Sequence, residues 1–446
     1  MNPLPRRWSC LLSLLVFSAR QTFALDGRPF IHDPSTVIQC DGVYYVYGTG
    51  DGMPFLTSPD GFTWQRGGRI FDRIPDSVHS LVPKNNGRMV WAPDVARING
   101  RYCLYYAVST WGSPVSAIGL LSSPTLDPKN PAYRWTDEGP IVHSLEGQDL
   151  NSIDPGVCTA PDGTYWLCYG SYIGNIQVLQ LDAKTGRRIA PDSPVWIVAN
   201  HSEASDIIYH DGYFYLLVNH GSCCVGARST YNIRFGRSAK VTGPYLDRHG
   251  DDLANGAGTL FLGSSGRQIG PGHFGRIFDD GVEKFSCHYE ADLDRGGRSV
   301  LDIRPLLWTP DGWPMPGRYV KAGTYQLLSR QTGTILQANR AQSAARMGDY
   351  LTHPDQQWTI TPAEGWYYTV INAETKKALQ ASADRSILLE TPAAAAGQLW
   401  KIDQLSDGSY RFECKANHMA LTAGRSDVSL ADFTGADTQR WDVAAP

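Results

Sequence analysis

Four short stretches decide the fold: Asp41-Gly-Val-Tyr-Tyr-Val-Tyr47, Asn99-Gly-Arg-Tyr-Cys-Leu-Tyr-Tyr106, Asp162-Gly-Thr-Tyr-Trp-Leu-Cys-Tyr169 and Asp211-Gly-Tyr-Phe-Tyr-Leu-Leu-Val218. Each places Asn-Gly or Asp-Gly ahead of alternating apolar residues, which is the strongest short signal for a β-hairpin. A weaker fifth copy occupies residues 280–289. Consecutive copies begin 49 to 69 residues apart, which leaves room for about four strands with their loops. We therefore predict a five-bladed β-propeller; a β-sandwich with fortuitous hairpins is the alternative.

A different repeat follows residue 316. Gln-x-Trp recurs with its tryptophans at Trp358, Trp400 and Trp441, which are 42 and 41 residues apart. Gly-x-Tyr recurs at nearly the same spacing, beginning at Gly323, Gly365 and Gly408. Three units of this length, each with one Gln-x-Trp, resemble a ricin-B-like β-trefoil. We therefore expect a propeller over residues 25–316 and a trefoil over residues 317–446.

Composition agrees with an all-β chain. Only 19% of the 446 residues are charged and 11% are aromatic, and the chain has 45 Gly and 28 Pro. Such values favour short strands and tight turns over helical bundles, and they exclude a disordered chain. The formal net charge is −4, which gives no electrostatic reason to expect a nucleic acid partner. A neutral, polar ligand is more natural.

The N-terminus has the pattern of a secretory signal peptide. Arg6 and Arg7 precede a short apolar run that ends near Thr22-Phe-Ala24. A membrane anchor is the alternative, but the run is shorter than the roughly 18–20 apolar residues that span a bilayer. We expect residues 1–24 to be removed and the protein to be secreted or periplasmic, with no membrane partner.

Eight cysteines remain after residue 24, and their spacing does not resemble a zinc site. Export permits disulfides. Cys223 and Cys224 are adjacent, and we expect them to form a vicinal disulfide; two buried thiols are the alternative. The sequence does not show how the other cysteines pair.

Acidic residues precede the hairpin turns at a shared distance. Asp33, Asp154 and Glu203 each lie eight residues before the Asp of a turn. Asp94 lies five residues before its turn, and His273 lies seven before the fifth. The inner strand of each blade lines the central channel, so a shared offset should place these side chains at similar heights. We therefore expect three carboxylates, with Asp94 and His273, to converge from different blades.

Converging carboxylates suit acid–base chemistry. Each residue taken alone has a plainer interpretation, since Asp before Pro is often part of a turn. In one apolar channel, however, burial and mutual repulsion drive some carboxyl pKa values up. Two carboxyl groups with different pKa values provide a general acid and a general base, as glycoside hydrolysis requires. Trp91, Trp111 and Tyr172 lie near these motifs and could stack on sugars or simply pack between strands.

Several motifs in order resemble family 43 glycoside hydrolases, and within that family the arabinan endo-1,5-α-L-arabinanases. The resemblance extends from about residue 28 to 310 and rests on His32-Asp-Pro34, Trp91-Ala-Pro-Asp94, Tyr105-Tyr-Ala-Val-Ser-Thr-Trp-Gly112, Ser116-Ala-Ile-Gly119, Tyr133-Arg-Trp135, Ile153-Asp-Pro155, Glu203-Ala204, Gly221-Ser-Cys-Cys224, Ser229-Thr-Tyr231 and Val241-Thr-Gly-Pro-Tyr-Leu-Asp247. It implies hydrolysis of α-1,5-linked arabinan with inversion at the anomeric carbon.

The same resemblance implies a role for individual residues. Asp33 matches the general base, Glu203 the general acid, and Asp154 the carboxylate that orients the acid and adjusts its pKa. His273 matches a histidine beside a hydrated cation, often calcium; since calcium prefers six to eight oxygen ligands, water would have to complete its shell. The expected substrate-binding residues are His32, Trp91, Asp94, Trp111 and Ser171.

Departures from the family pattern leave alternatives open. The usual Glu-Ala-Pro is Glu203-Ala-Ser205 here. In the trefoil, residues 336–338, 379–381 and 421–423 read Leu-Gln-Ala, Leu-Gln-Ala and Leu-Thr-Ala, where sugar-binding trefoils usually carry Asp after Leu. The trefoil could bind polysaccharide or only pack on the propeller. The activity could also be that of an α-L-arabinofuranosidase or β-xylosidase, or the protein could be a non-catalytic carbohydrate-binding protein.

Overall fold

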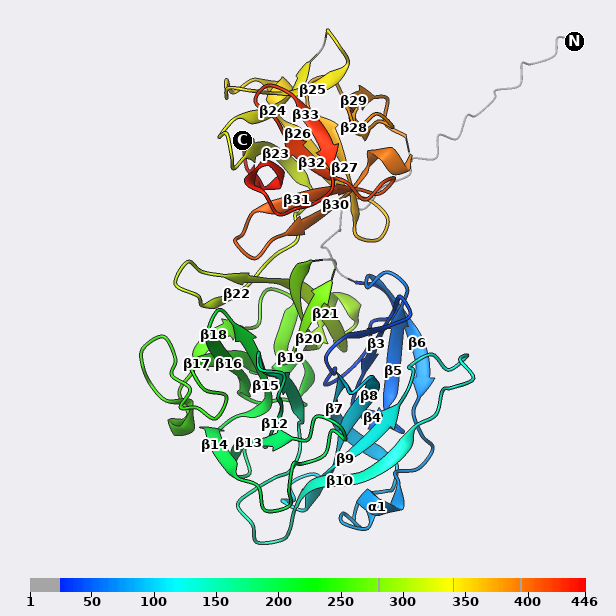
Figure 1. Cartoon of the computed structure of the whole chain (residues 1–446), viewed down its shortest axis with the longest axis vertical. Coiled ribbons are helices and arrows are strands. Elements are labelled where there is room, and N and C mark those ends of the chain that lie inside the picture. Colours follow the sequence, from blue (N-terminus) through cyan, green and yellow to red (C-terminus); the bar gives the residue numbers. More distant parts are fainter. Residues whose placement is uncertain (1–24, 280, 340, 394) are drawn as a thin grey trace, which may run out of the picture.

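The computed structural model describes residues 25–279, 281–339, 341–393 and 395–446 and is almost entirely β-structure. A ring of five sheets forms the larger body, and a single twelve-stranded sheet forms the smaller one above it (Figure 1). The predicted all-β class, with a five-bladed propeller followed by a β-trefoil, is therefore confirmed. The predicted signal peptide lies outside the described residues.

Each propeller sheet is built mainly from consecutive antiparallel strands. Blade 1 contains β1 (Asp26–Gly27), β2 (Ile38–Cys40), β3 (Val43–Tyr47), β5 (Pro54–Ser58) and β6 (Thr63–Arg69). Blade 2 contains β4 (Gly50–Asp51), β7 (Met89–Ile98), β8 (Arg101–Val108), β9 (Ser116–Ser123) and β10 (Thr136–Ser144). Blade 3 contains β11 (Gly156–Thr159), β12 (Tyr165–Tyr169), β13 (Asn175–Leu181) and β14 (Val195–Asn200).

The remaining two blades follow the same plan. Blade 4 contains β15 (Glu203–His210), β16 (Tyr213–His220), β17 (Asn232–Ser238) and β18 (Thr259–Leu262). Blade 5 contains β19 (Gln268–Asp279), β20 (Val282–Asp292), β21 (Arg298–Trp308) and β22 (Pro314–Pro316). The helices in this body are α1 (Asp76–His79) and the 3₁₀ turns η1 (Gly226–Arg228), η2 (Leu253–Asn255) and η3 (Leu293–Arg295).

Apolar side chains between neighbouring blades hold the ring closed. Separate buried clusters join blades 1 and 2, 2 and 3, 3 and 4, and 4 and 5. A fifth cluster joins blade 5 to blade 1, with Leu301 and Ile303 packed among residues such as Val46 and Trp64. Because the first and last blades share a core, face-to-face packing closes the ring of five blades.

The trefoil repeats one hydrogen-bonding plan three times. The indole Nε1 atoms of Trp358, Trp400 and Trp441 donate to the carbonyl oxygens of Leu336, Leu379 and Leu421, at 2.9, 2.9 and 3.0 Å. All three tryptophans are fully buried. The Gln-x-Trp motif therefore fixes each tryptophan to the Leu-Gln-Ala or Leu-Thr-Ala strand of its own repeat.

The strands and 3₁₀ turns of the trefoil follow one another along the chain. They are β23 (Gly323–Ser329), β24 (Ile335–Asn339), β25 (Ala344–Gly348), η4 (Pro354–Gln356), β26 (Trp358–Pro362), β27 (Tyr367–Asn372), β28 (Ala378–Ala381), β29 (Ile387–Glu390), η5 (Ala396–Gln398), β30 (Leu399–Gln404), β31 (Tyr410–Cys414), β32 (Ala420–Ala423), β33 (Val428–Ala431), η6 (Asp437–Gln439) and β34 (Trp441–Ala444).

The two bodies share a packed junction. Trp366 of the trefoil packs against Phe62, with ring centroids 4.9 Å apart, and its Nε1 donates to the Asp60 carbonyl at 2.8 Å. Nζ of Lys284 on β20 lies 3.7 Å from Oδ1 of Asp403 on β30, and both residues are buried. Apolar contact and a buried ion pair therefore seat the trefoil on the propeller.

The junction lies at the hairpin-turn end of the blades. Asp60 follows Ser58, which pairs with Tyr44 beside the Asp41-Gly42 turn. Strand β20 begins next to the turn at Gly281, and Lys284 lies near that start. His288 lies further along the same strand and contacts Asp33. Since Asp33 precedes β2 and β2 ends at the turn, Asp33 lies at the opposite end of blade 1. The trefoil therefore packs on the face opposite to Asp33.

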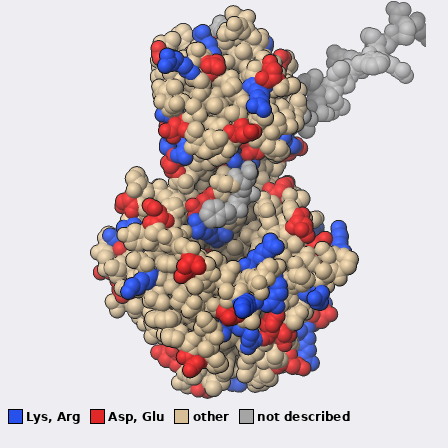
Figure 2. Space-filling view, in the orientation of Figure 1, with Lys and Arg blue, Asp and Glu red and all other residues tan. Residues whose placement is uncertain are grey.

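In the face shown in Figure 2, acidic and basic residues are interspersed over both bodies. This agrees with the small net charge of −4. Within the described part of the chain, no helix is long and apolar enough to cross a membrane.

Candidate active site

One residue in each blade adopts a left-handed backbone conformation at the same end of the inner strand. The five residues are Asp33, Ala92, Asp154, Ala204 and His273, with φ between 32° and 56°. Strands β7, β15 and β19 each carry a register irregularity at this point. Residues other than glycine seldom adopt such φ values, and they often do so at functional sites. At three of these positions the side chains, Asp33, Asp154 and His273, interact with one another at this end of the channel.

The repeated position corrects one expectation from the sequence. Asp33 and Asp154 occupy it, but in blade 4 the equivalent residue is Ala204 and not Glu203. Glu203 is one residue earlier, where Trp91 stands in blade 2. The equal offset of eight residues therefore does not mean equivalent positions, because the irregularity in β15 changes the count. The backbone amide of Ala204 donates to Oδ2 of Asp154 at 3.1 Å, and this bond brings blades 3 and 4 together.

Histidines and one hydroxyl surround the Asp33 carboxylate. Thr49 Oγ1 donates to Oδ2 at 2.6 Å, and Nδ1 of His273 lies 3.1 Å from Oδ1. Nε2 of His32 lies 3.5 Å from the same oxygen. Burial alone would raise the pKa of Asp33, but the charges of His32 and His273 outweigh it and hold that pKa well below its ordinary value. Asp33 is therefore an ionised carboxylate across the neutral range.

The two flanking histidines are affected in the opposite sense. Burial would lower the pKa of His32, but Asp33 outweighs it and raises that pKa to about 10. The pKa of His273 is raised to about 9 because Asp33 again outweighs burial. Asp33 is thus embedded in positive charge.

His288 completes this group and did not emerge from the sequence. It is fully buried on β20, and its Nδ1 accepts a hydrogen bond from the backbone amide of Asp33 at 2.7 Å. Burial, and then the positive charge of His32, hold the pKa of His288 well below its ordinary value. A neutral His288 therefore fixes the strained backbone at Asp33. Its position in the fifth hairpin repeat, residues 280–289, was the available signal, because a histidine there interrupts an apolar strand.

Glu203 lies in the contrasting environment. Its Oε1 accepts a hydrogen bond from the Tyr231 hydroxyl at 2.9 Å. Burial, followed by the negative charge of Asp154, raises the pKa of Glu203 to about 8, although Tyr231 and His273 oppose the shift. Glu203 is therefore largely protonated at pH 7, while Asp33 is ionised.

Asp154 lies between these two extremes. Burial raises its pKa to about 6, with Asp33 acting in the same direction and His273 in the opposite one. Above that pH its negative charge opposes ionisation of Glu203. The carboxyl groups of blades 1, 3 and 4 therefore interact, and one of them is ionised while another holds its proton.

Two predicted substrate-binding residues are engaged in holding the scaffold. Oδ1 of Asp94 accepts from the Thr36 amide of blade 1 at 2.9 Å, and Oδ2 accepts from the Val157 amide of blade 3 at 2.8 Å. Asp94 is buried, and burial raises its pKa. Ser171 is also buried, and its Oγ accepts from Nδ2 of Asn151 at 3.0 Å. These contacts leave the predicted sugar contacts of Asp94 and Ser171 without support.

The predicted aromatic residues remain available to a ligand. Trp111 is 78% exposed, and its ring packs edge-on against Trp91 with centroids 6.3 Å apart. Tyr172 is 41% exposed, and its hydroxyl donates to the carbonyl of Gly221 at 2.9 Å. An exposed indole supported by a second indole is suited to stacking on a sugar ring, and this keeps Trp111 and Trp91 as predicted binding residues. His32 lies beside Asp33, as its motif requires.

The residues around His273 offer few ligands for calcium. His273, His288 and Asp33 supply two imidazoles and one carboxylate within 4.8 Å of one another. Calcium prefers six to eight oxygen ligands, so these residues do not fit a calcium ion that they bind directly. Nε2 of His273 is buried and lacks a hydrogen-bond partner among the described residues. That nitrogen fits a water molecule, or a cation whose shell consists mostly of water.

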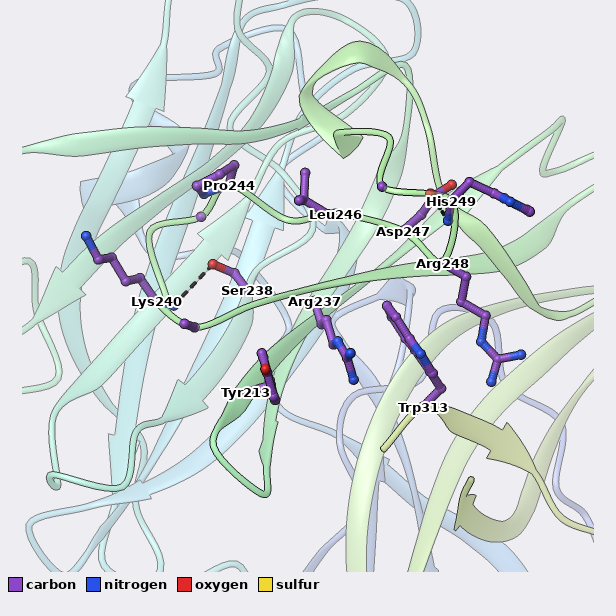
Figure 3. Close-up of a pocket in the computed structure, with 13 residues that line it drawn as sticks. Tyr213, Arg237, Ser238, Lys240, Pro244, Leu246, Asp247, Arg248, His249 and Trp313 are labelled. Atoms are coloured by element: carbon purple, nitrogen blue, oxygen red, sulfur yellow. Dashed lines mark hydrogen bonds between the residues drawn. The ribbon is translucent and has the colours of Figure 1, made fainter. Parts of the chain in front are cut away.

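A separate hollow of about 650 Å³ lies on blade 4 beside β22 (Figure 3). The Arg237 guanidinium lies between the rings of Tyr213 and Trp313, at 4.5 and 3.9 Å from their centroids. The carboxylate of Asp247 accepts from the backbone amides of His249, Asp251 and Gly258. Its polar groups are therefore engaged in stacking and loop structure, and the hollow contains no pair of carboxyl groups.

Opposite protonation of two carboxyl groups at one end of a propeller channel is the arrangement that cleavage of a glycosidic bond needs, so fold and site together define a glycoside hydrolase. The chain belongs to the glycosyl hydrolases family 43, which matches residues 27–314. Residues 308–386 and 354–441 match the ricin-type β-trefoil lectin domain-like family.

Individual relatives cover the propeller. The extracellular endo-α-(1→5)-L-arabinanase 1 of Bacillus subtilis is 36% identical over 298 residues, which is 65% of this chain and 88% of the relative. The extracellular exo-α-(1→5)-L-arabinofuranosidase of Cellvibrio japonicus is 33% identical over 302 residues, 64% of this chain and 85% of the relative. The structure of Cellvibrio cellulosa α-L-arabinanase with arabinohexaose superposes with a TM-score of 0.61 at 31% identity, covering 64% of this chain and 95% of that one.

Proposed function

We propose that the protein is an exported hydrolase of α-1,5-linked L-arabinan that cleaves within the chain and inverts the anomeric carbon. The observation that carries this proposal is that two carboxyl groups at one end of the channel have pKa values shifted in opposite directions. The pKa of Asp33 is lowered and that of Glu203 is raised. The names of the Bacillus and Cellvibrio relatives support the substrate, and the word extracellular in two of them supports export.

The proposed reaction uses the two carboxyl groups in one displacement. Asp33, kept ionised by His32 and His273, accepts a proton from a water molecule that attacks the anomeric carbon. Glu203 donates its proton to the departing sugar oxygen as the glycosidic bond breaks. Water enters on the face opposite to the leaving group, so the product has the inverted configuration.

Asp154 acts in this scheme through Glu203. Its charge opposes ionisation of the acid, and its bond to the Ala204 amide holds the residue that follows Glu203. Asp154 is therefore a positioning residue. When bound, a hydrated cation beside His273 supplies positive charge near Asp33, and the buried Nε2 of His273 is the nitrogen that would face it.

The aromatic pair and the trefoil complete the proposal. Trp111, supported by Trp91, stacks on arabinose, because an exposed indole presents a flat apolar face to the sugar. The trefoil lies on the opposite face of the propeller, so it leaves the channel end open to a long polysaccharide. We assign the trefoil a packing role here, because the side chain of each Gln-x-Trp glutamine is bonded within its own repeat.

The test is hydrolysis of linear α-1,5-arabinan with products sized at early times and the new anomer followed by ¹H NMR. We expect a mixture of oligosaccharides of the inverted configuration, and little cleavage of linear xylan. Release of single arabinose units would instead indicate exo action, and retention of configuration would contradict the roles of Asp33 and Glu203. Release of no sugar from arabinan or xylan would favour a non-catalytic binding protein.

The matched variant is Glu203→Gln, which keeps the size of the side chain and its ability to bond Tyr231. General acid catalysis contributes roughly 10²–10⁴-fold, so we expect turnover of linear arabinan to fall within that range. Near-normal turnover by this variant would show that Glu203 is not the acid. Melting temperature serves as the folding control.

A further inference from the structure

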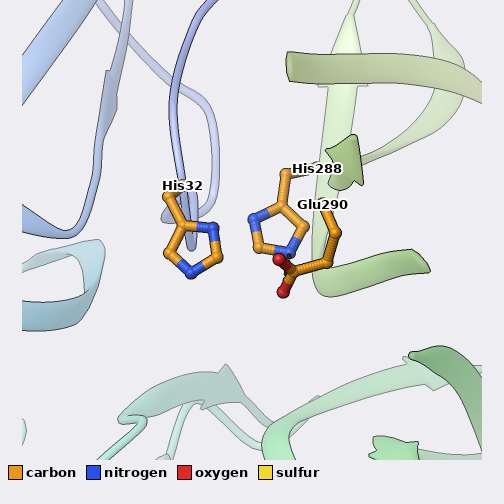
Figure 4. A group of neighbouring side chains, drawn as sticks. All are labelled: His32, His288 and Glu290. Carbon is orange, nitrogen blue, oxygen red and sulfur yellow. Dashed lines mark ion pairs between the residues drawn. The ribbon is translucent and has the colours of Figure 1, made fainter. Parts of the chain in front are cut away.

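Beside the acid–base site lies a cluster whose two thiols and Glu290 the proposed mechanism does not use. Cys223 and Cys224 follow β16 as free cysteines, which differs from the vicinal disulfide expected from the sequence. Their sulfur atoms lie 2.7 Å apart, and Sγ of Cys224 lies 3.7 Å from Nε2 of His32. Ligand atoms of Cys223, Cys224 and Glu290 all lie within 4.8 Å of one another, as do those of His32, His288 and Glu290. Glu290 belongs to both groups, and Figure 4 shows its carboxylate beside His32 and His288.

Glu290 is a buried carboxylate that is only partly satisfied: the Cys224 backbone amide bonds to it, but one of its oxygens has no partner among the described residues. Its side chain is 3% exposed, and its Oε1 accepts no hydrogen bond from any described residue. Nε2 of the neutral His288 lies 3.9 Å away and also lacks a hydrogen bond. Buried polar atoms are rarely left unsatisfied, and each exception calls for an explanation such as an ion or a water. The carboxylate of Glu290 lies within 4.8 Å of ligand atoms of the two thiols and of the two rings.

The spacing and type of these donors fit a thiophilic divalent cation. In a tetrahedral zinc site with bonds of about 2.0–2.3 Å, neighbouring ligand atoms lie roughly 3.3–3.8 Å apart. The Cys224–His32 separation of 3.7 Å matches this spacing. The two sulfur atoms are closer than it and must separate by about 1 Å, by side-chain rotation, for both to bind one ion. Thiolate, imidazole and carboxylate are the ligands that zinc accepts, whereas calcium takes oxygen.

We propose that Cys223, Cys224, His32 and Glu290 form an inhibitory site for a thiophilic divalent cation of the zinc class. Cys224 is exposed to solvent, so an ion can enter from outside. On binding, each coordinating group that still carries a proton, including the protonated His32 ring, releases it to solvent, and Nε2 of His32 then directs its lone pair to the metal. That nitrogen lies 3.5 Å from Oδ1 of Asp33 in the metal-free protein. Metal binding therefore removes the proton of His32, one of the two charged partners of Asp33, and places an ion beside the acid–base site.

The inhibitory consequence rests on the proposed function, but the binding itself does not. The first experiment therefore measures binding to the full chain after reduction and removal of reductant. Zn²⁺ is titrated in competition with a chromophoric chelator, and Co²⁺ is added separately and followed by absorption. We expect one equivalent of Zn²⁺ and a near-ultraviolet charge-transfer band from thiolate to Co²⁺.

Variants separate this site from other metal binding. Cys224→Ser and Glu290→Gln should each weaken Zn²⁺ binding at least tenfold, and Cys224→Ser should also reduce the Co²⁺ charge-transfer band. Cys414→Ala is the matched control, since it removes a thiol from the distant trefoil, and it should bind as the wild type does. Equal affinity in wild type and both site variants, a Co²⁺ complex without the thiolate band, or no binding after reduction would each overturn the site.

Activity supplies an independent outcome. We expect Zn²⁺ to inhibit arabinan hydrolysis in proportion to site occupancy and a chelator to restore it. Cys224→Ser, compared with its own metal-free rate, should need at least tenfold more Zn²⁺ for the same inhibition. If Zn²⁺ occupies the site and the rate is unchanged, the inhibitory role is wrong. Failure of the wild type to hydrolyse any polysaccharide would count against the proposed function and leave the binding result to stand.

Discussion

The two repeat systems of this chain use symmetry in opposite ways. In the trefoil, each repeat places the same tryptophan in the core and bonds it to the same leucine carbonyl. In the propeller, each repeat places one residue at the same strained backbone position, but that residue is Asp in two blades, Ala in two and His in one. Those residues are Asp33, Ala92, Asp154, Ala204 and His273.

This difference separates stability from function. In the trefoil, the repeated tryptophans and glutamines satisfy their hydrogen bonds within the repeats, as expected of a core motif. The propeller position carries charges whose pKa values are displaced by their neighbours across blades. The repeated backbone conformation places one residue of each blade at the same end of the channel. The residue type at that position then determines which blades contribute an ionisable group. Substitutions in the two systems should therefore have different consequences.

The largest effect should come from Asp33→Asn. The amide has nearly the size of the carboxylate but cannot accept the proton from water, so kcat on linear arabinan should fall about 10³-fold. The melting temperature should change little in comparison, which distinguishes loss of chemistry from loss of fold. A variant with more than a tenth of the wild-type kcat would show that the strained propeller position is not where the base acts.

The matched change in the trefoil is Trp400→Ala. Removing a fully buried indole should lower the free energy of unfolding of the trefoil by about 3–5 kcal/mol, measured by urea denaturation. At 25 °C, turnover of short arabino-oligosaccharides should remain near that of the wild type, because the trefoil packs opposite to Asp33. If the variant stays folded but loses turnover, the trefoil tryptophan contributes to catalysis. That result would contradict the assignment of stability to the trefoil repeats and of catalysis to the propeller repeats.

Asp154→Asn should shift the alkaline limb of the kcat/KM pH profile, the part where activity falls as pH rises, to lower pH. Glu203 must be protonated to act as acid, so kcat/KM falls as pH rises through its pKa. Since the Asp154 charge helps to raise that pKa to about 8, removing the charge should lower it and shift the alkaline limb to lower pH. The other groups that act on Glu203 are Tyr231, His273 and Asp33. An unchanged alkaline limb would show that Asp154 does not act through Glu203.

The smallest effect is expected from Tyr231→Phe, and its sign is opposite. The hydroxyl donates to Glu203 and so favours the ionised form. Its removal should raise the Glu203 pKa and shift the alkaline limb to higher pH. One hydrogen bond contributes roughly 1 kcal/mol, which corresponds to a shift of less than about one pH unit. Limbs that move in the same direction in Tyr231→Phe and Asp154→Asn would contradict the assignment of this limb to Glu203.

The fold could be predicted because both repeats are local patterns. Asp-Gly turns before apolar strands and the Gln-x-Trp spacing each report on a short segment, and the chain repeats them often enough to count. Asp33, Asp154 and Glu203 could be found in the same way, because each lies a fixed distance from a turn. His273 and His32 followed from their motifs and do lie beside Asp33.

The rest of the site depends on contacts between strands that are distant in sequence. His288 reaches Asp33 from β20, 255 residues away, and no local pattern measures that distance. Asp94 was predicted to face the substrate, yet its two oxygens bind backbone amides of neighbouring blades. The irregularity in β15 also shifts Glu203 by one residue from the repeated position, which counting residues cannot detect.

The central claim is that Glu203 holds a proton while Asp33 is ionised, and the pH dependence of wild-type kcat/KM tests it most directly. This quantity reports the pKa values of the free enzyme. With linear α-1,5-arabinan as substrate, we predict full activity near pH 7 and an alkaline decline with a midpoint near pH 8 that is absent from Glu203→Gln. A decline centred near 4.5, the ordinary pKa of a glutamate, would contradict the account.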